Sequence, residues 1–114
     1  MASQPIVGLT EQDYLALERA AEFKSEFVDG EMYAMSGGTS RHSRLAIRFA
    51  VALEIQLKDR KCMVFNSDMR IRIAKSKNYL YPDLSVVCGV ETSLEVDNLE
   101  NPTVVVEVLS PLNR

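Results

Sequence analysis

The sequence contains no apolar run long enough to cross a membrane. Its first ten residues, MASQPIVGLT, have neither the basic stretch nor the apolar stretch of a secretory signal. These two absences argue against a membrane partner and against secretion. We therefore expect a cytoplasmic protein.

The chain has only two cysteines, Cys62 and Cys88. They show no CxxC spacing, and no histidine is near either of them in the sequence, so neither a zinc site nor a redox pair is indicated. Both lie in apolar segments, where an unpaired cysteine behaves as a small hydrophobic residue. We expect two buried free thiols.

Repeats, low-complexity tracts and interdomain linkers are also absent. A chain of 114 residues can bury roughly two-thirds of its unfolded surface, which is enough for one core. Its 46% hydrophobic and 25% charged residues exclude the disordered and fibrous classes. We expect one domain spanning residues 1–114.

The chain has no net positive charge: its formal net charge is −3 and its pI is about 5.1. This balance by itself argues against a nucleic-acid partner. Residues 41–77, however, contain ten Lys or Arg and three acids, a local charge of +7 that leaves −10 for the rest. Charge this uneven predicts a basic surface beside an acidic site.

Two segments have the patterns of helices. Thr10 followed by Asp13 matches a capping box and predicts a helix over residues 11–20. A second, longer helix is predicted over 41–59, where apolar residues recur every four positions. These residues are Leu45, Phe49, Leu53 and Leu57.

The remaining segments are typical of strands. Asp29-Gly30 predicts a two-residue hairpin turn between strands at 25–28 and 31–35. In MRIRIA the apolar residues alternate with Arg70 and Arg72, which predicts that the arginine face lies in solvent. Further strands are expected at CMVFNS, at 79–88 and at 101–111, with an acidic loop over 91–101. This order favours the α/β (α+β) class, with a mixed β-sheet flanked by helices.

Each of the last two predicted strands carries one acid. Asp83 follows a proline, and Glu107 stands among valines with Val105 and Leu109 on its face. A buried carboxylate needs a cation, hydrogen-bond donors or a proton. If the two strands are neighbours, both acids reach one cavity and could bind Mg²⁺ or Mn²⁺. The alternative is a salt bridge from Glu107 to an arginine and a solvent-facing Asp83.

Four motifs in order resemble the Uma-type family of restriction endonucleases, within the PD-(D/E)xK nuclease superfamily. They are SEFVDGEMYAMSG, RHSRLAIRFAVAL, PDLSVV and PTVVVEVLSP, and they cover about residues 10–111. The resemblance implies a restriction-endonuclease-like fold. It also implies metal-dependent hydrolysis of DNA phosphodiester bonds.

The resemblance assigns roles to four residues. Asp83 and Glu107 match the two motif acids and would be the ligands of Mg²⁺ or Mn²⁺. Glu26 matches an acid before the DG turn, as a further ligand or a group that positions water; its alternative is a surface acid beside the hairpin. His42 matches the histidine at a helix start and would contact phosphate or orient a ligand, although a lone histidine on an apolar stripe can also be structural.

The chain departs from the superfamily pattern at its lysine. The position two residues after Glu107 is Leu109, and no lysine follows Glu107. In the Uma-type family the lysine comes from a helix after EVLSP, so we expect the nuclease domain to be truncated after this strand, with its C-terminal part missing. Lys75, Lys77, Arg70 or Arg72 could substitute in space. Two hypotheses follow: an endonuclease, or a catalytically incomplete nuclease-fold module that binds DNA or a protein partner.

The charge map also predicts contacts with DNA. Arg41, Arg44 and Arg48 share one side of the long helix, and Arg70 and Arg72 share one strand face. The alternative interpretation is that these arginines are ordinary solvent-exposed side chains. The sequence also predicts the oligomeric state. If no helix covers the last strand, its apolar face is exposed, and an exposed apolar face is typical of a protein–protein interface. Restriction-type nucleases also commonly act as dimers, so we expect a homodimer.

Overall fold

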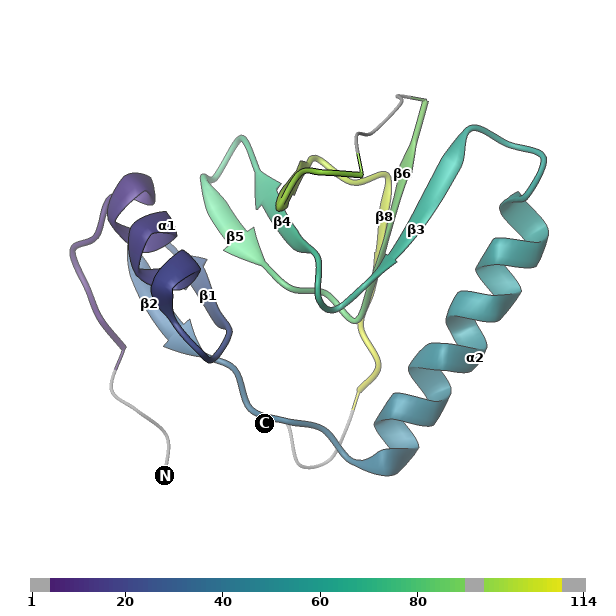
Figure 1. Cartoon of the computed structure of the whole chain (residues 1–114), viewed down its shortest axis with the longest axis horizontal. Coiled ribbons are helices and arrows are strands. Elements are labelled where there is room, and N and C mark those ends of the chain that lie inside the picture. The colour runs from purple at the N-terminus through teal and green to yellow at the C-terminus, as the bar shows by residue number, and fades with distance from the viewer. Residues whose placement is uncertain (1–4, 90–93, 110–114) are drawn as a thin grey trace.

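The computed structural model describes residues 5–89 and 94–109 (Figure 1). Within these residues the chain forms two helices, α1 (Glu11–Ala20) and α2 (Ser40–Leu57), and eight strands. The strands are β1 (Ser25–Val28), β2 (Glu31–Ala34), β3 (Cys62–Asn66), β4 (Arg70–Ile73), β5 (Asn78–Leu80), β6 (Leu84–Cys88), β7 (Asn98–Glu100) and β8 (Val104–Val106). The predicted α+β class, with mixed strand pairing and flanking helices, is confirmed.

The described strands divide between two sheets. One sheet has the order β2-β1-β5-β4-β7, and the other has the order β3-β6-β8. β4 and β7 run parallel, whereas the other paired strands are antiparallel. The five-stranded sheet is therefore mixed, and the three-stranded sheet is antiparallel.

The local signals for α1 and for the hairpin are confirmed. Thr10 accepts a hydrogen bond from the Asp13 N–H, and the Asp13 carboxylate accepts one from the Thr10 N–H, so both halves of the capping box form. Asp29 and Gly30 have φ angles of 52° and 80°. Two positive φ angles are what a tight hairpin turn of this kind requires, and they explain why Asp-Gly stands there.

Three predicted segments differ from the structure. The strand expected at 79–88 is two strands, because the chain leaves the five-stranded sheet after β5 and enters the other sheet at β6. Pro82 lies in this crossing, where its missing N–H breaks no strand ladder. The expected loop at 91–101 contains β7, which pairs with β4. The last strand ends at Val106, so Glu107 follows it directly.

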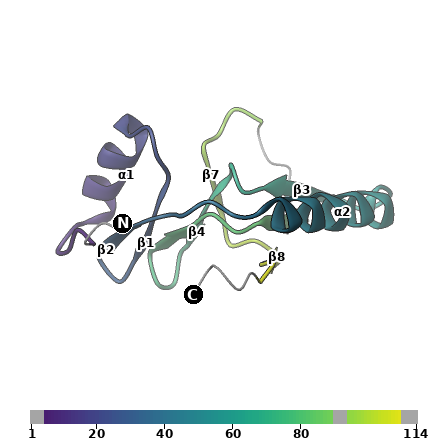
Figure 2. The ribbon, with the colours of Figure 1, turned by 90° about the horizontal axis from the view of Figure 1, so that it is seen from below.

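One core cluster of the five-stranded sheet lies between the hairpin and α1, and a second joins Ile71 of β4 and Leu99 of β7 to Val87 of β6. Tyr14 of α1 is fully buried, and its ring stacks on Phe27 of β1 with 4.9 Å between centroids. Met32 and Tyr79 complete the cluster. Figure 2 shows α1 standing on one side of the hairpin, so the opposite side of β1 and β2 is left for other contacts.

α2 lies at the end of the molecule opposite α1, alongside β3 (Figure 1). None of its 18 residues is buried, although the helix was predicted from its apolar stripe. In the part of the chain that the structure describes, neither helix has the length and apolar character needed to cross a bilayer.

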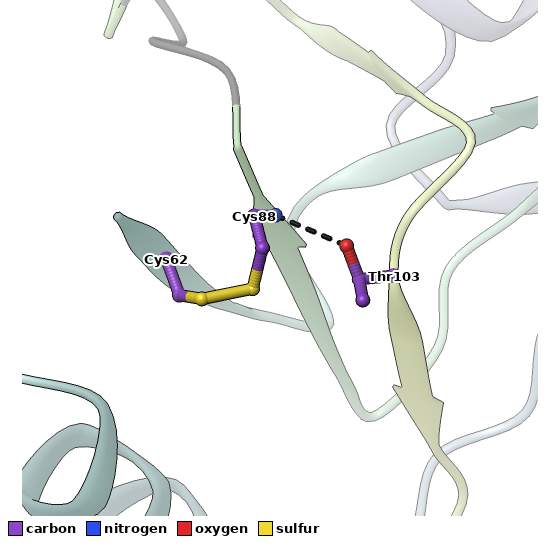
Figure 3. Close-up of a disulfide and its surroundings, with 3 residues drawn as sticks. All are labelled: Cys62, Cys88 and Thr103. Carbon is purple, nitrogen blue, oxygen red and sulfur yellow. Dashed lines mark hydrogen bonds between the residues drawn. A yellow bond between two sulfur atoms is a disulfide. The ribbon is translucent and has the colours of Figure 1, made fainter. Parts of the chain in front are cut away.

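The expectation of free thiols at Cys62 and Cys88 is wrong, because the two cysteines form a disulfide (Figure 3). β3 and β6 are antiparallel, and their register places the two residues directly opposite each other with 4.0 Å between Cα atoms. Both side chains are only partly buried. Their 26-residue separation in sequence concealed a pairing that the strand register creates.

Candidate active site

The four predicted catalytic residues line one cleft of about 700 Å³. Glu26 comes from β1, His42 from the first turn of α2, Asp83 from the residue before β6, and Glu107 from the residue after β8. Residues 35–38, between β2 and α2, form another part of the wall. The structure thus brings together residues that are up to 81 positions apart in sequence.

Asp83 and Glu107 face each other because of the pairing of β6 and β8. Leu84 pairs with Val106, so the next position in the antiparallel register places Asp83 opposite Glu107. The Asp83 N–H donates to Glu107 Oε1 at 3.1 Å, and the Val108 N–H donates to Asp83 Oδ2 at 2.7 Å. The pairing of β6 with β8 meets the condition under which the two acids were expected to reach one cavity.

His42 connects the start of α2 to this acid pair. Thr39 caps the helix, with its Oγ1 accepting from the His42 N–H at 3.2 Å. The ring Nε2 of His42 lies 3.1 Å from Asp83 Oδ2, and both side chains are largely buried. His42 therefore contacts an acid of the cleft as well as standing at the beginning of the apolar stripe.

Glu26 joins the hairpin to the segment before β6. Its Oε2 accepts a hydrogen bond from the Tyr81 N–H at 2.9 Å. Tyr81 is followed by Pro82 and Asp83, so this bond fixes the chain two residues before a cleft acid. Glu26 is half-buried in the wall of the cleft and is not the free surface acid of the alternative interpretation.

Glu107 lines the cleft with three other acids, and as a whole residue it is exposed and not buried as expected. Partial burial raises the pKa of the Glu107 carboxyl, and the nearby charges of Asp83 and Glu26 raise it further. The hydrogen bond from the Asp83 N–H and the charge of His42 act in the opposite direction. A cation placed between these acids would relieve their repulsion.

The donor set fits a hard divalent cation. Asp83 and Glu107 offer carboxylate oxygens, and Mg²⁺ commonly binds through one or two carboxylates while water and phosphate complete its shell. Among residues 5–89 and 94–109, no three His, Cys, Asp or Glu side chains converge into a ready-made metal site. An ion bound here would therefore take at most a few ligands from the protein, and water and substrate would fill its remaining positions.

A network of buried polar side chains contacts Tyr81, which lines the cleft. The carboxylate of Glu18 in α1 accepts from the Ser25 N–H and from the Tyr81 hydroxyl, the latter at 2.6 Å. The Tyr81 hydroxyl in turn accepts from Nη1 of Arg70 at 3.2 Å. Glu18 and Tyr81 were not among the residues predicted from the sequence. Only the position of Tyr81, two residues before Asp83, could have indicated its role.

The expectation that the arginine face of β4 lies in solvent is wrong for Arg70, which is 5% exposed. Arg70 donates to Asn98 at the start of β7, to Asp97 directly before it and to Tyr81 after β5, because β7 and β5 both lie next to β4. Arg72 donates to Glu11 at 2.7 Å and to Glu100 at 3.3 Å. Their predicted contact with DNA stays a prediction, with both guanidinium groups already bound to carboxylates.

Most of the basic residues that the sequence singled out lie outside the cleft. Arg41, Arg44 and Arg48 are exposed on α2. None of the four expected lysine substitutes, Lys75, Lys77, Arg70 and Arg72, lines the cleft. Lys24 does line it, although it was not predicted from the sequence. Lys24 and Glu26 are two positions apart and therefore point to the same side of a strand, and this spacing could have indicated Lys24.

The chain is similar to known proteins in family, in sequence and in fold. A family model described as "Putative restriction endonuclease" matches residues 11–114. Two uncharacterised proteins of Synechocystis sp. are similar to the chain: one is 37% identical over 96% of this chain and 57% of its own length, the other 39% over 90% and 59%. The chain thus spans less than two-thirds of the curated relatives that it matches.

A solved structure supports the fold. It is the crystal structure of a protein from Anabaena variabilis that is titled a putative nuclease belonging to DUF820. The match has a TM-score of 0.75 and covers 91% of this chain and 60% of that one. At 21% sequence identity it shows a shared fold.

Proposed function

The chain belongs to the Uma2 family of putative restriction endonucleases, and on this premise we propose that it hydrolyses DNA phosphodiester bonds with Mg²⁺ or Mn²⁺. The observation that supports the proposal best is the placement of Asp83 and Glu107 opposite each other in a cleft that also contains Glu26 and His42. Two carboxylates at one point are the ligands that a phosphate-bound divalent ion requires.

Asp83 and Glu107 would hold the ion. When bound, Mg²⁺ or Mn²⁺ stabilises the charge that develops on phosphate and lowers the pKa of a coordinated water. The protein residues set the geometry around it. His42, 3.1 Å from Asp83 Oδ2, holds the Asp83 carboxylate in place, and Glu26 holds the chain before it through the Tyr81 N–H.

Cleavage of plasmid DNA tests the activity. The parent protein should convert supercoiled DNA to nicked or linear forms with Mg²⁺ or Mn²⁺. Asp83→Ala and Glu107→Ala should lose this activity, whereas Asp59→Ala, at an exposed residue after α2, should keep it. Absence of cleavage by the parent with either ion, or full activity in both acid variants, would refute the proposed hydrolysis.

Thermal stability tests the metal ligands independently of activity. A divalent ion binds the folded site and scarcely binds the unfolded chain, so it should raise the melting temperature of the parent. Glu107→Gln keeps the shape of the side chain but removes its charge, so without metal it should be at least as stable as the parent, and with metal it should gain little. A salt bridge of Glu107 to an arginine is absent among the described residues. A parent protein whose melting temperature ignores both ions would contradict the assignment of Glu107 as a ligand.

A second candidate function is a nuclease-fold module that binds DNA or protein without turnover. Asp83 Oδ2 already accepts from the Val108 N–H and contacts His42, and Glu107 Oε1 accepts from the Asp83 N–H. These contacts leave fewer free oxygens for an ion. DNA binding without cleavage under every metal condition would favour this module over the enzyme.

We also propose DNA contacts through Arg41, Arg44 and Arg48 and a homodimer formed through α2. The arginines are exposed, and large apolar side chains on the same helix, such as Phe49 and Ile55, are about half exposed or more. DNA affinity should fall steeply with salt if the arginines contact phosphates. A light-scattering mass near 12.8 kDa at high concentration would contradict the dimer.

The cytoplasmic location stays a prediction. Because disulfides are rare in the cytosol, cell fractionation is a direct test of it.

A further inference from the structure

The cleft contains four acids but only one lysine or arginine. Glu22, Glu26, Asp83 and Glu107 line it, and Lys24 is the sole Lys or Arg among the described residues in its wall. A cleft with this charge balance repels a phosphodiester unless cations offset the acids. Among the described residues, Lys24 is the lysine that can offset the acids, beside any metal ion and His42 when its ring carries a proton.

The hairpin directs Lys24 into the cleft. Phe27 and Met32 pair across the hairpin and pack on the α1 side. Because side chains alternate along a strand, Glu26 and its partner Tyr33 point to the opposite side. The Met35 N–H donates to the Lys24 carbonyl at 3.0 Å, which extends the pairing by one more step. Lys24 therefore emerges on the same side as Glu26.

The Lys24 ammonium is held beside the segment that carries Asp83. Nζ donates to the Ser67 carbonyl at 3.0 Å and lies 5.5 Å from the centroid of the Tyr81 ring. Its contact with Asp68 is longer, 3.5 Å, and the carboxylate of Asp68 is 84% exposed. An ammonium has three donors. Ser67 and Asp68 accept from two of them, and because the side chain of Lys24 is 40% exposed, the third remains available to an anion that enters the cleft.

We propose that Lys24 donates to a non-bridging oxygen of the substrate phosphodiester and stabilises the negative charge that develops there. This inference rests on the proposed nuclease function. It assigns a catalytic role to the lysine that the described residues place in the wall of the cleft. A compact ammonium with fixed direction is suited to this task, because prearranged donors cost no reorganisation when charge develops.

Three substitutions separate the charge of Lys24 from its structural contact. Lys24→Gln keeps a donor for the Ser67 carbonyl but removes the charge, and Lys24→Arg keeps the charge. Lys61→Met removes an exposed lysine outside the cleft. Melting temperatures establish that each variant is folded. Lys24→Gln should lower kcat by about 100- to 1000-fold with little change in KM, as expected for a lost donor to developing charge, whereas Lys24→Arg should retain more activity and Lys61→Met should equal the parent.

DNA binding without divalent ions gives a second measurement that does not depend on cleavage. Anisotropy of a fluorescein-labelled duplex in EDTA, measured over a series of salt concentrations, reports the number of phosphate contacts. Lys24→Gln should reduce the slope of log K against log salt by about one, and Lys24→Arg should restore it.

The outcomes distinguish this inference from the function on which it rests. If the parent cuts DNA and Lys24→Gln cuts equally well with an unchanged salt slope, the role of Lys24 is refuted and the nuclease stands. If the parent binds DNA and never cuts, while Lys24→Gln loses one unit of slope, the phosphate contact stands and the nuclease function fails. A parent that neither binds nor cuts refutes both.

Discussion

The two helices bury very different amounts of side chain, although both begin at a threonine cap. α1 has ten residues and buries Tyr14 and Glu18. α2 has eighteen and buries none. The shorter helix is therefore part of the core, while the longer one contributes mainly His42 to the cleft and an apolar surface to its surroundings.

The difference follows from what each helix packs against. α1 lies on the hairpin, where Tyr14 stacks on Phe27 and donates its hydroxyl proton to the Ser25 carbonyl at 2.6 Å. α2 contacts β3 and leaves five large apolar side chains exposed, namely Leu45, Ile47, Phe49, Val51 and Ile55. An exposed patch of this kind is typical of an interaction surface. Apolar periodicity thus predicts a helix without predicting what covers it.

The largest expected effect compares one aromatic residue from each helix. Tyr14→Ala should lower the free energy of unfolding by about 3 to 5 kcal/mol, because it opens a cavity in a packed core. Phe49→Ala, at a residue that is 48% exposed, should lower it by no more than about 1 kcal/mol in the monomer. Urea denaturation of both variants measures the two values. Equal losses would mean that α2 is packed as firmly as α1.

The disulfide should contribute next most, and it lies on the α2 side of the molecule. Linking Cys62 to Cys88, 26 positions apart, restricts the unfolded chain, and its loss should cost about 2 to 4 kcal/mol. Denaturation with and without dithiothreitol measures this contribution. A Cys62→Ser, Cys88→Ser double variant should resemble the reduced parent and ignore the reductant. A parent that is unaffected by reduction would show that the β3–β6 pairing needs no covalent support.

Replacing one arginine from each region should have a smaller effect. Arg70→Met removes donors to Asn98, Tyr81 and Asp97, and it should cost about 2 to 3 kcal/mol, since hydrogen bonds to charged groups are worth about 1.5 to 3 kcal/mol. Arg48→Met, on exposed α2, should change stability by less than about 0.5 kcal/mol. Chemical denaturation without DNA provides the measurement. A larger loss of stability in Arg48→Met than in Arg70→Met would mean that the arginine that stabilises the fold is on α2 and not on β4.

The smallest effect concerns the pH dependence of the first turn of α1. A hydrogen bond from Arg72 holds the pKa of Glu11 below its usual 4.5, helped by the Tyr79 hydroxyl and the Arg72 charge and opposed by burial. A depressed folded pKa means that the associated stability is present above pH 4.5 and is lost as the pH falls through the lower folded value. Glu11→Gln should therefore flatten the acid limb of the curve of melting temperature against pH. Glu54→Gln, exposed on α2, should follow the parent, and an unchanged acid limb in Glu11→Gln would exclude this linkage.

Much of the local structure could be predicted from the sequence, because the responsible residues are close together along the chain. The capping box at Thr10 and the Asp29-Gly30 turn specify α1 and the hairpin within a few positions. The apolar stripe likewise predicts α2. The convergence of Asp83 and Glu107 also followed from sequence once their strands were taken as neighbours.

Pairing between distant segments was decided by the tertiary structure. The change of sheet at Pro82 divides one predicted strand into two, and the neighbourhood of β4 and β7 turns Arg70 from a surface residue into a buried donor. The disulfide depends on the register of β3 with β6. These outcomes depend on which strand lies beside which, and no residue encodes that choice alone.

Lys24 shows the same division within the site. Its alternation with Glu26 determines that the two side chains leave the hairpin on one side. Whether that side meets solvent or the acids of β6 and β8 depends on how the two sheets are placed around the cleft. The sequence by itself determined the helices, the turn and the identity of the acids, because these follow from short-range backbone and side-chain preferences. Only the tertiary structure decided which lysine lines the cleft together with the acids, because that placement results from packing between segments far apart in the chain.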